Sequence, residues 1–153
     1  MTRQKSYSDL LKSIPKPEKT PEFNIGGKLI ICLIEYRIME EIEYVINAVL
    51  RVYNCQEIGL AIVHGTHNEK YINEKFGTWN NIKLINTKHQ NLDRGGYSAL
   101  LKQPQFYEHF SNWSHMLVYQ TDALLIRRID DVYFDFDYIG APWTTKNQWT
   151  KYN

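Results

Sequence analysis

The chain alternates short apolar runs with amphipathic segments. Four apolar runs have the length and composition of buried strands: residues 28–34, 58–63, 81–86 and 116–119. Between them, segments with helical character cover residues 40–53, 69–76 and 97–110. The order β-α-β-α-β-α-β predicts an α/β fold, with an open, mostly parallel, Rossmann-like sheet and helices on both faces.

Two local signals refine the helical segments. Thr66 and Glu69 have the spacing of a capping box at the start of the second helix. Pro104 lies inside the third helical segment and has no backbone N–H to donate. It therefore predicts a kink or two shorter helices.

Residues 1–24 differ in composition from the rest of the chain, because they carry four Lys, one Arg and three Pro. Only residues 8–14 suit a helical turn or two before Pro15, Pro17 and Pro21 end it. We expect residues 1–24 to be a flexible tail and residues 25–153 to form the domain.

Composition narrows the class of protein. A chain of 153 residues suits one domain, and a net charge of +1 gives no argument for a nucleic-acid or membrane surface. No apolar run reaches the roughly 18 residues that span a bilayer, and no signal peptide is visible. Two cysteines are too few for a disulfide scaffold. We therefore expect no transmembrane segment, no nucleic-acid partner and a cytoplasmic location.

Polar residues follow the fourth apolar run. Gln120 and Asp122 point to the same face if the extended conformation persists, because strand side chains alternate. Ligands of open α/β sheets bind beyond the carboxyl ends of the strands, and an acid there can hold a divalent cation. Neither a G-x-G-x-x-G fingerprint after the first strand nor a phosphate-binding loop is present, which weakens the dinucleotide-enzyme and NTPase interpretations.

Three blocks then carry a resemblance: Gln-Thr-Asp at 120–122, Ile-Asp-Asp at 129–131 and Asp-Tyr-Ile-Gly-Ala-Pro-Trp at 137–143. They resemble a glycosyltransferase-like family known mainly as a domain of unknown function, which is similar to the GT-A nucleotide-sugar transferases. The resemblance covers roughly residues 28–143. It implies a nucleotide-diphospho-sugar donor, an unknown acceptor (a glycan, a protein or a lipid), and sugar transfer in which Mn²⁺ or Mg²⁺ stabilises the departing diphosphate.

The resemblance also implies roles for the residues after the fourth strand. The family's acidic motif, usually Asp-x-Asp, binds the metal and the diphosphate. Gln120 takes the first position here, so the metal role carries over to Asp122 alone. Gln120 either bonds a ribose or sugar hydroxyl or is a plain strand-end polar residue.

In GT-A enzymes the nucleotide lies across the ends of the first and fourth strands. Glu35 is then expected to contact the nucleoside, and its alternative is a solvated loop acid. Arg37 either pairs with a phosphate or forms a salt bridge with Glu40 or Glu41. Arg94, in the turn of residues 93–96, either contacts the diphosphate at a helix start or belongs to a flexible loop.

The remaining candidates favour structural roles. His64 and His67 lie three residues apart, but no cysteine or carboxylate shares their turn, so the spacing does not predict a zinc site. Asp130 and Asp131 are expected to cap a short turn. Trp143 either fills the core or stacks on a sugar ring.

Two functions of different class follow. The first is a GT-A-like glycosyltransferase domain that binds a nucleotide sugar. Because GT-A domains continue past the acidic motif, residues 25–153 are expected to be its donor-binding part, without the acceptor half. The second is a non-catalytic sugar- or partner-binding remnant of such an enzyme.

Overall fold

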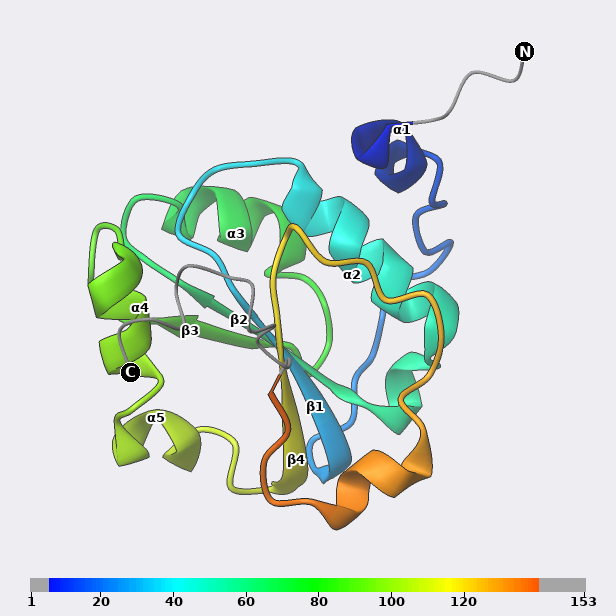
Figure 1. Ribbon diagram of the computed structural model, residues 1–153. Coiled ribbons are helices and arrows are strands. Elements are labelled where there is room, and N and C mark those ends of the chain that lie inside the picture. The colour runs from blue at the N-terminus through cyan, green and yellow to red at the C-terminus, as the bar shows by residue number, and fades with distance from the viewer. Residues whose placement is uncertain (1–5, 141–153) are drawn as a thin grey trace.

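A four-stranded parallel sheet forms the centre of the computed structural model, which describes residues 6–140 (Figure 1). The spatial order is β3-β2-β1-β4, and every pair of neighbours is parallel. The strands are β1 (Gly27–Ile34), β2 (Gly59–His64), β3 (Lys83–Asn86) and β4 (Trp113–Tyr119). The first strand is therefore central, and the chain moves to its other side only when it forms β4.

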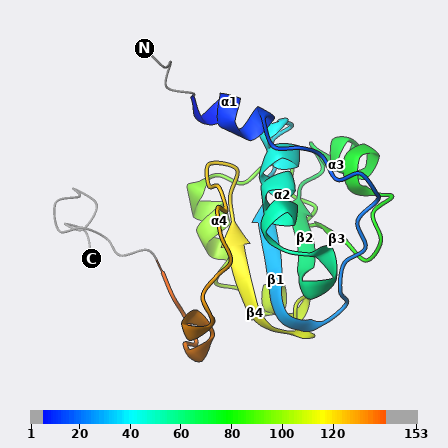
Figure 2. The ribbon, with the colours of Figure 1, turned by 90° about the vertical axis from the view of Figure 1, so that its right-hand side faces the viewer.

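Helices cover both faces of this sheet (Figures 1 and 2). On one face, Leu29, Ile31 and Leu33 of β1 share a core with α2 (Glu41–Val52) and α3 (Glu69–Phe76). On the other face, Ile30, Cys32 and Ile34 share a core with α4 (Arg94–Leu100) and α5 (Pro104–Glu108). Because successive side chains of β1 enter opposite cores, a continuous apolar run is what this strand requires. The predicted α/β fold class is confirmed.

Some element boundaries differ from the predicted ones. β4 begins at Trp113, before the apolar run, because Trp113 and His115 pair with Gly27 and Leu29 of β1. β3 begins only at Lys83, since Asn81 has a positive φ of 61° and belongs to a turn. Pairing with a neighbour and turn geometry thus set the ends of these strands.

The helix signals had mixed outcomes. The Pro104 prediction is confirmed: α4 ends at Leu100, and Pro104 is the first residue of α5. The capping-box prediction for Thr66 is wrong, because Asn68 is the N-cap of α3 and makes no side-chain cap bond. Its amide instead bonds to other loops, as described below.

Residues 6–24 do not form the flexible tail that their composition suggested. A short helix, α1 (Tyr7–Lys12), is capped by Ser6 and lies against α2. Leu11, Ile14 and Phe23 are buried in the core that contains α2 and α3. The prolines direct an extended course, while the burial of three apolar side chains holds the segment on the domain.

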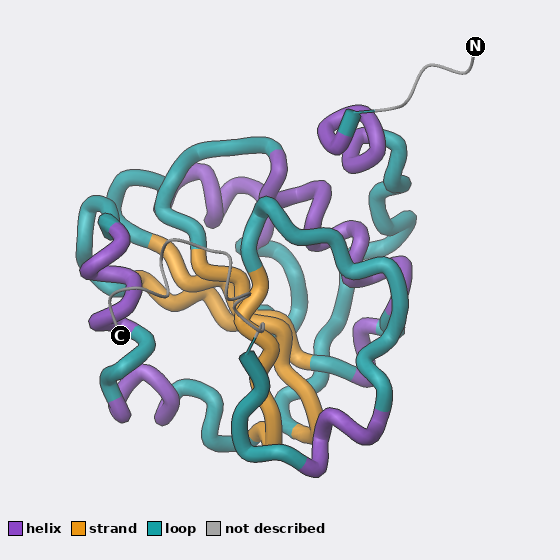
Figure 3. The backbone as a smooth tube through the Cα atoms, in the orientation of Figure 1, coloured by secondary structure: helices purple, strands orange, loops and turns teal. Residues whose placement is uncertain are grey.

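Two short 3₁₀ helices complete the elements, η1 (Cys55–Glu57) and η2 (Asp131–Asp135). The backbone trace in Figure 3 shows the long loop that leads from β4 to η2. Within residues 6–140, no helix is long and apolar enough to cross a membrane.

Candidate functional site

The carboxyl ends of β1 and β4 lie side by side at one edge of the sheet. Leu33 is paired with Tyr119, the last residue of β4, so the segments that follow the two strands leave the sheet together. The chain order of the strands reverses between these two strands. In open α/β sheets such a switch point is where the connections diverge and leave a crevice for ligands.

Glu35, directly after β1, is a buried carboxylate with a side chain only 7% exposed. Its Oε1 accepts hydrogen bonds from the backbone N–H groups of Tyr36 (3.0 Å) and Arg37 (2.9 Å) and from Arg37 Nε (2.8 Å). Its Oε2 accepts from Arg37 Nη2 (2.7 Å) and Thr121 Oγ1 (3.1 Å). The alternative of a solvated loop acid is therefore wrong, and both carboxylate oxygens are already occupied by donors.

This arrangement explains the protonation state of Glu35. Burial alone would raise its pKa, but the hydrogen bonds and the charge of Arg37, together with the Thr121 hydroxyl, outweigh burial and hold the pKa below its ordinary 4.5. The carboxylate is thus ionised at neutral pH, and it holds the guanidinium through a bidentate contact.

Arg37 is the exposed member of the pair, with 65% of its side chain accessible. Glu35 is its salt-bridge partner, rather than the expected Glu40 or Glu41. A guanidinium has five N–H donors. Nε and one N–H of Nη2 are directed to Glu35, and no other residue in the described part of the chain accepts from this side chain, so three donors remain.

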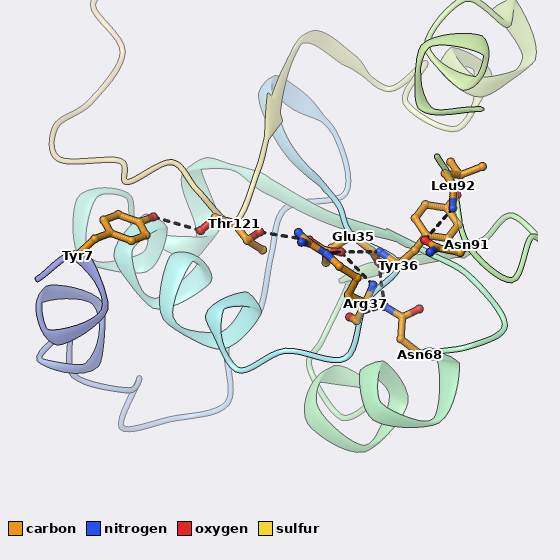
Figure 4. Close-up of polar contacts among 8 residues, drawn as sticks. All are labelled: Tyr7, Glu35, Tyr36, Arg37, Asn68, Asn91, Leu92 and Thr121. Carbon is orange, nitrogen blue, oxygen red and sulfur yellow. Dashed lines mark hydrogen bonds and ion pairs between the residues drawn. The ribbon is translucent and has the colours of Figure 1, made fainter. Parts of the chain in front are cut away.

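Asn68, which Figure 4 shows beside Arg37, and Gly65 fix the neighbouring loops of the same edge. The fully buried Asn68 donates from Nδ2 to the carbonyls of Glu35 (2.9 Å) and Arg37 (3.2 Å), and it accepts from the Gly65 N–H (3.1 Å). A side chain on Gly65 would collide with the His89 carbonyl and the Tyr36 ring, so this close approach requires glycine. The hydrogen bonds of Asn68 thus hold the loop that carries Arg37.

Gln120 and Asp122 follow β4 and are both exposed, whereas Thr121 between them is buried. The Gln120 side chain is hydrogen-bonded to the phenol of Tyr97 on α4. The hydrogen bonds with Glu35 do most to raise the pKa of Arg37, and the charges of Asp122 and Glu41 add to this effect. Asp122 is therefore close enough to Arg37 to interact with it electrostatically.

Arg94 is the first residue of α4 and is exposed. The carboxylate of Asp93 caps this helix by accepting from the Gly96 N–H at 2.7 Å, so the turn is ordered rather than a flexible loop. Three residues further along α4, Tyr97 reaches Gln120. Arg94 thus lies on the helix that borders the edge, while the direct contacts join Glu35, Arg37 and Thr121.

The other candidates have structural positions. His64 is buried, and its Nδ1 lies 3.1 Å from the Gly65 carbonyl. Asp130 makes no side-chain cap bond to η2 and pairs with Arg127, whereas Asp131 pairs with Lys28. Trp143 lies outside the described residues. Across residues 6–140 no group of three or more His, Cys, Asp or Glu side chains is placed to hold a metal ion.

Two cavities lie elsewhere. One, of about 290 Å³, is at the amino ends of the strands, where Gly59 and Trp113 line it. The other, of about 320 Å³, lies between residues 16–21 and the outer side of α2 and α3. Neither contains any of the converging polar groups, so we place the candidate site at the carboxyl edge by its topology and chemistry.

Sequence reasoning did not identify Thr121, Asn68, Tyr97 or Tyr7 as parts of this edge. For Thr121 a signal existed, since strand alternation that exposes Gln120 and Asp122 turns the residue between them inward. The other three come from helices or helix caps that are distant in sequence. No local pattern marks them.

Comparisons with known proteins give one partial match. Residues 81–153 match a family described as "Protein of unknown function (DUF5672)". No curated protein and no solved structure matches the chain. The matched segment includes β4 and the residues that follow it, but not β1.

Proposed function

We propose that this chain binds a nucleotide-diphospho-sugar at the carboxyl ends of β1 and β4, as a GT-A-like glycosyltransferase domain. One observation carries the proposal: an exposed guanidinium, held by a buried carboxylate, lies within electrostatic range of an exposed carboxylate at the switch point of a parallel sheet. At such a crevice, a guanidinium suits the oxygens of a diphosphate, and a carboxylate suits the cation that accompanies it.

Each residue then has a distinct role. Arg37 donates its three remaining N–H groups to the diphosphate, and Glu35 is a positioning residue that holds Arg37 instead of a direct ribose acceptor. Gln120, oriented by Tyr97, bonds a ribose or sugar hydroxyl. Arg94 adds positive charge from the bordering helix.

The fit of a divalent cation rests on Asp122. Mn²⁺ or Mg²⁺ commonly takes one or two carboxylates together with waters and substrate phosphates, so a single exposed carboxylate suits a cation that arrives with the diphosphate. When bound, the cation would stabilise the charge on the departing diphosphate. The acceptor, whether a glycan, a protein or a lipid, follows only from the resemblance.

A second candidate is a non-catalytic sugar- or partner-binding domain. The observation that favours it is Gln120, which replaces the first acid of the family motif and is hydrogen-bonded to Tyr97. Such a domain would bind the nucleotide sugar without transferring the sugar. Release of free sugar or transfer to added glycans separates the two candidates.

Calorimetry tests the binding proposal. The purified chain is titrated with UDP, GDP and their sugar conjugates, with and without Mn²⁺. We expect binding of at least one nucleotide only when Mn²⁺ is present, because the single carboxylate holds the free ion poorly. Asp122→Asn should abolish the metal-dependent binding and leave the melting temperature unchanged, since Asp122 is exposed.

Asp130→Asn is the matched control, because it makes the same charge change at another exposed aspartate, which pairs with Arg127 at the surface. It should bind as the wild type does. Tight Mn²⁺ binding without nucleotide, or nucleotide binding that survives Asp122→Asn, would show that the site has been misplaced.

A further inference from the structure

The N-terminal helix lies against the turn that carries Asp122. The phenol of Tyr7, on α1, donates its single proton between two carbonyl oxygens, those of Thr121 (3.1 Å) and Ala123 (3.0 Å). These two carbonyls stand on either side of Asp122. Figure 4 shows Tyr7, Thr121 and Glu35 as successive parts of one line of contacts that reaches Arg37.

The hydroxyl of Tyr7 is separable from the packing of α1. The helix is anchored by Leu11, which is fully buried, and by Ile14 further along the chain. Tyr7 itself is 43% exposed, so its ring contributes little to the core. Removing only the hydroxyl should leave the helix docked.

The turn after β4 also has hydrogen bonds to the rest of the domain. The hydroxyl of the buried Thr121 donates to Glu35 Oε2 (3.1 Å). The Ala123 N–H donates to the Gln120 carbonyl (3.1 Å), and the Leu125 N–H donates to Tyr119 Oη (2.8 Å). Asp122 has no hydrogen-bond partner for its side chain among residues 6–140. Where its carboxylate lies therefore depends on the backbone of the turn, which is held by Tyr7 together with the bond from Thr121 to Glu35.

We propose that Tyr7 is a positioning residue, which clamps residues 121–123 and thereby orients Asp122 for the cation and the diphosphate. α1 is then part of the binding site, although it lies more than a hundred residues away in the chain. The clamp itself rests on the geometry alone, and its role in binding rests on the proposed function.

Amide exchange tests the clamp without any ligand. In Tyr7→Phe, the protected N–H groups of Ala123 and Leu125 should exchange roughly three- to tenfold faster by NMR, the effect of losing one hydrogen bond from a local opening equilibrium. Tyr44→Phe is the matched control: it removes a phenolic hydroxyl of α2 that bonds to Glu40, the N-cap of that helix. It should leave both amides unchanged.

The second readout is the affinity for UDP in the presence of Mn²⁺. Tyr7→Phe should bind roughly three- to tenfold more weakly than the wild type, with the melting temperature unchanged, and Tyr44→Phe should bind normally. Unchanged exchange at Ala123 and Leu125 overturns the clamp, whatever the nucleotide does. Faster exchange with undiminished affinity overturns its role in binding. If the wild type binds no nucleotide, the proposed function fails, while the exchange rates still decide the clamp.

Discussion

At the scale of single residues, the candidate site has one buried side chain that anchors a neighbour and two exposed side chains. Glu35 is buried and its oxygens are occupied, whereas Arg37 and Asp122 are exposed and retain capacity for a ligand. A guanidinium already held by a bidentate partner loses less side-chain entropy when it binds a phosphate. The buried Glu35 thus fixes the Arg37 guanidinium in place before any ligand binds.

Under the proposed function, Gln120→Asp should strengthen metal binding, because it adds a second carboxylate close to Asp122. We expect Mn²⁺ affinity in the presence of UDP to increase on the order of tenfold, which corresponds to about 1.4 kcal/mol. Calorimetry measures the change. Gln103→Asp is the matched control, since it adds the same charge at an exposed residue between α4 and α5. An equal gain in both variants would indicate a general charge effect and not a ligand.

At the scale of elements, residues 6–24 contribute to the domain. α1 and the proline-containing segment after it bury Leu11, Ile14 and Phe23 against the layer formed by α2 and α3. The segment also joins the domain through the backbone, because Phe23 donates to the Asn80 carbonyl and Asn80 donates to the Pro21 carbonyl. These contacts make it a structural element.

Leu11→Ala should lower the free energy of unfolding by about 2–5 kcal/mol, the usual cost of truncating a fully buried leucine. The neighbouring Leu10 is 42% exposed on the same helix, so Leu10→Ala should change stability by only about 0.5 kcal/mol. Urea unfolding of both variants measures the difference. Similar small effects at both positions would mean that α1 is not docked in solution.

At the scale of the whole molecule, the buried Glu35 and the partly buried Glu43 couple stability to pH. Like Glu35, Glu43 has a lowered pKa: burial alone would raise it, but its contacts with Lys75 (2.7 Å) and Lys16 (3.4 Å) outweigh burial. A carboxylate whose pKa is lower in the folded than in the unfolded chain stabilises the fold above the unfolded pKa. That contribution is lost as pH falls through the folded pKa.

The free energy of unfolding should therefore fall as pH decreases below the ordinary glutamate value of 4.5. Glu35→Gln should cost about 1–3 kcal/mol at pH 7, because charged hydrogen bonds are lost, and should weaken this pH dependence. Urea unfolding between pH 7 and pH 3 measures both effects. Glu108→Gln changes an exposed glutamate of α5 and should follow the wild-type curve. If Glu35→Gln kept the pH dependence of the wild type, Glu35 would not be a source of that dependence.

The sequence alone determined the architecture of this protein. Continuous apolar runs and helical periodicity are local patterns, and they predicted a parallel sheet with helices on both faces. They also placed Glu35, Arg37, Gln120 and Asp122 at strand ends, where the structure brings them to one edge. The capping box predicted at Thr66 was wrong. Asn68 is the N-cap of α3, and its amide bonds to the carbonyls of Glu35 and Arg37 instead of capping the helix.

Only the tertiary structure decided which contacts those residues make there. The burial of Glu35 depends on Thr121, which lies 86 residues further along the chain, and the clamp on the Asp122 turn comes from Tyr7, 114 residues before Thr121. Such contacts join segments that are far apart in the sequence, so no local periodicity encodes them. The flexible-tail expectation for residues 6–24 failed for the same reason, because composition shows the prolines but not the apolar surface that Leu11, Ile14 and Phe23 cover.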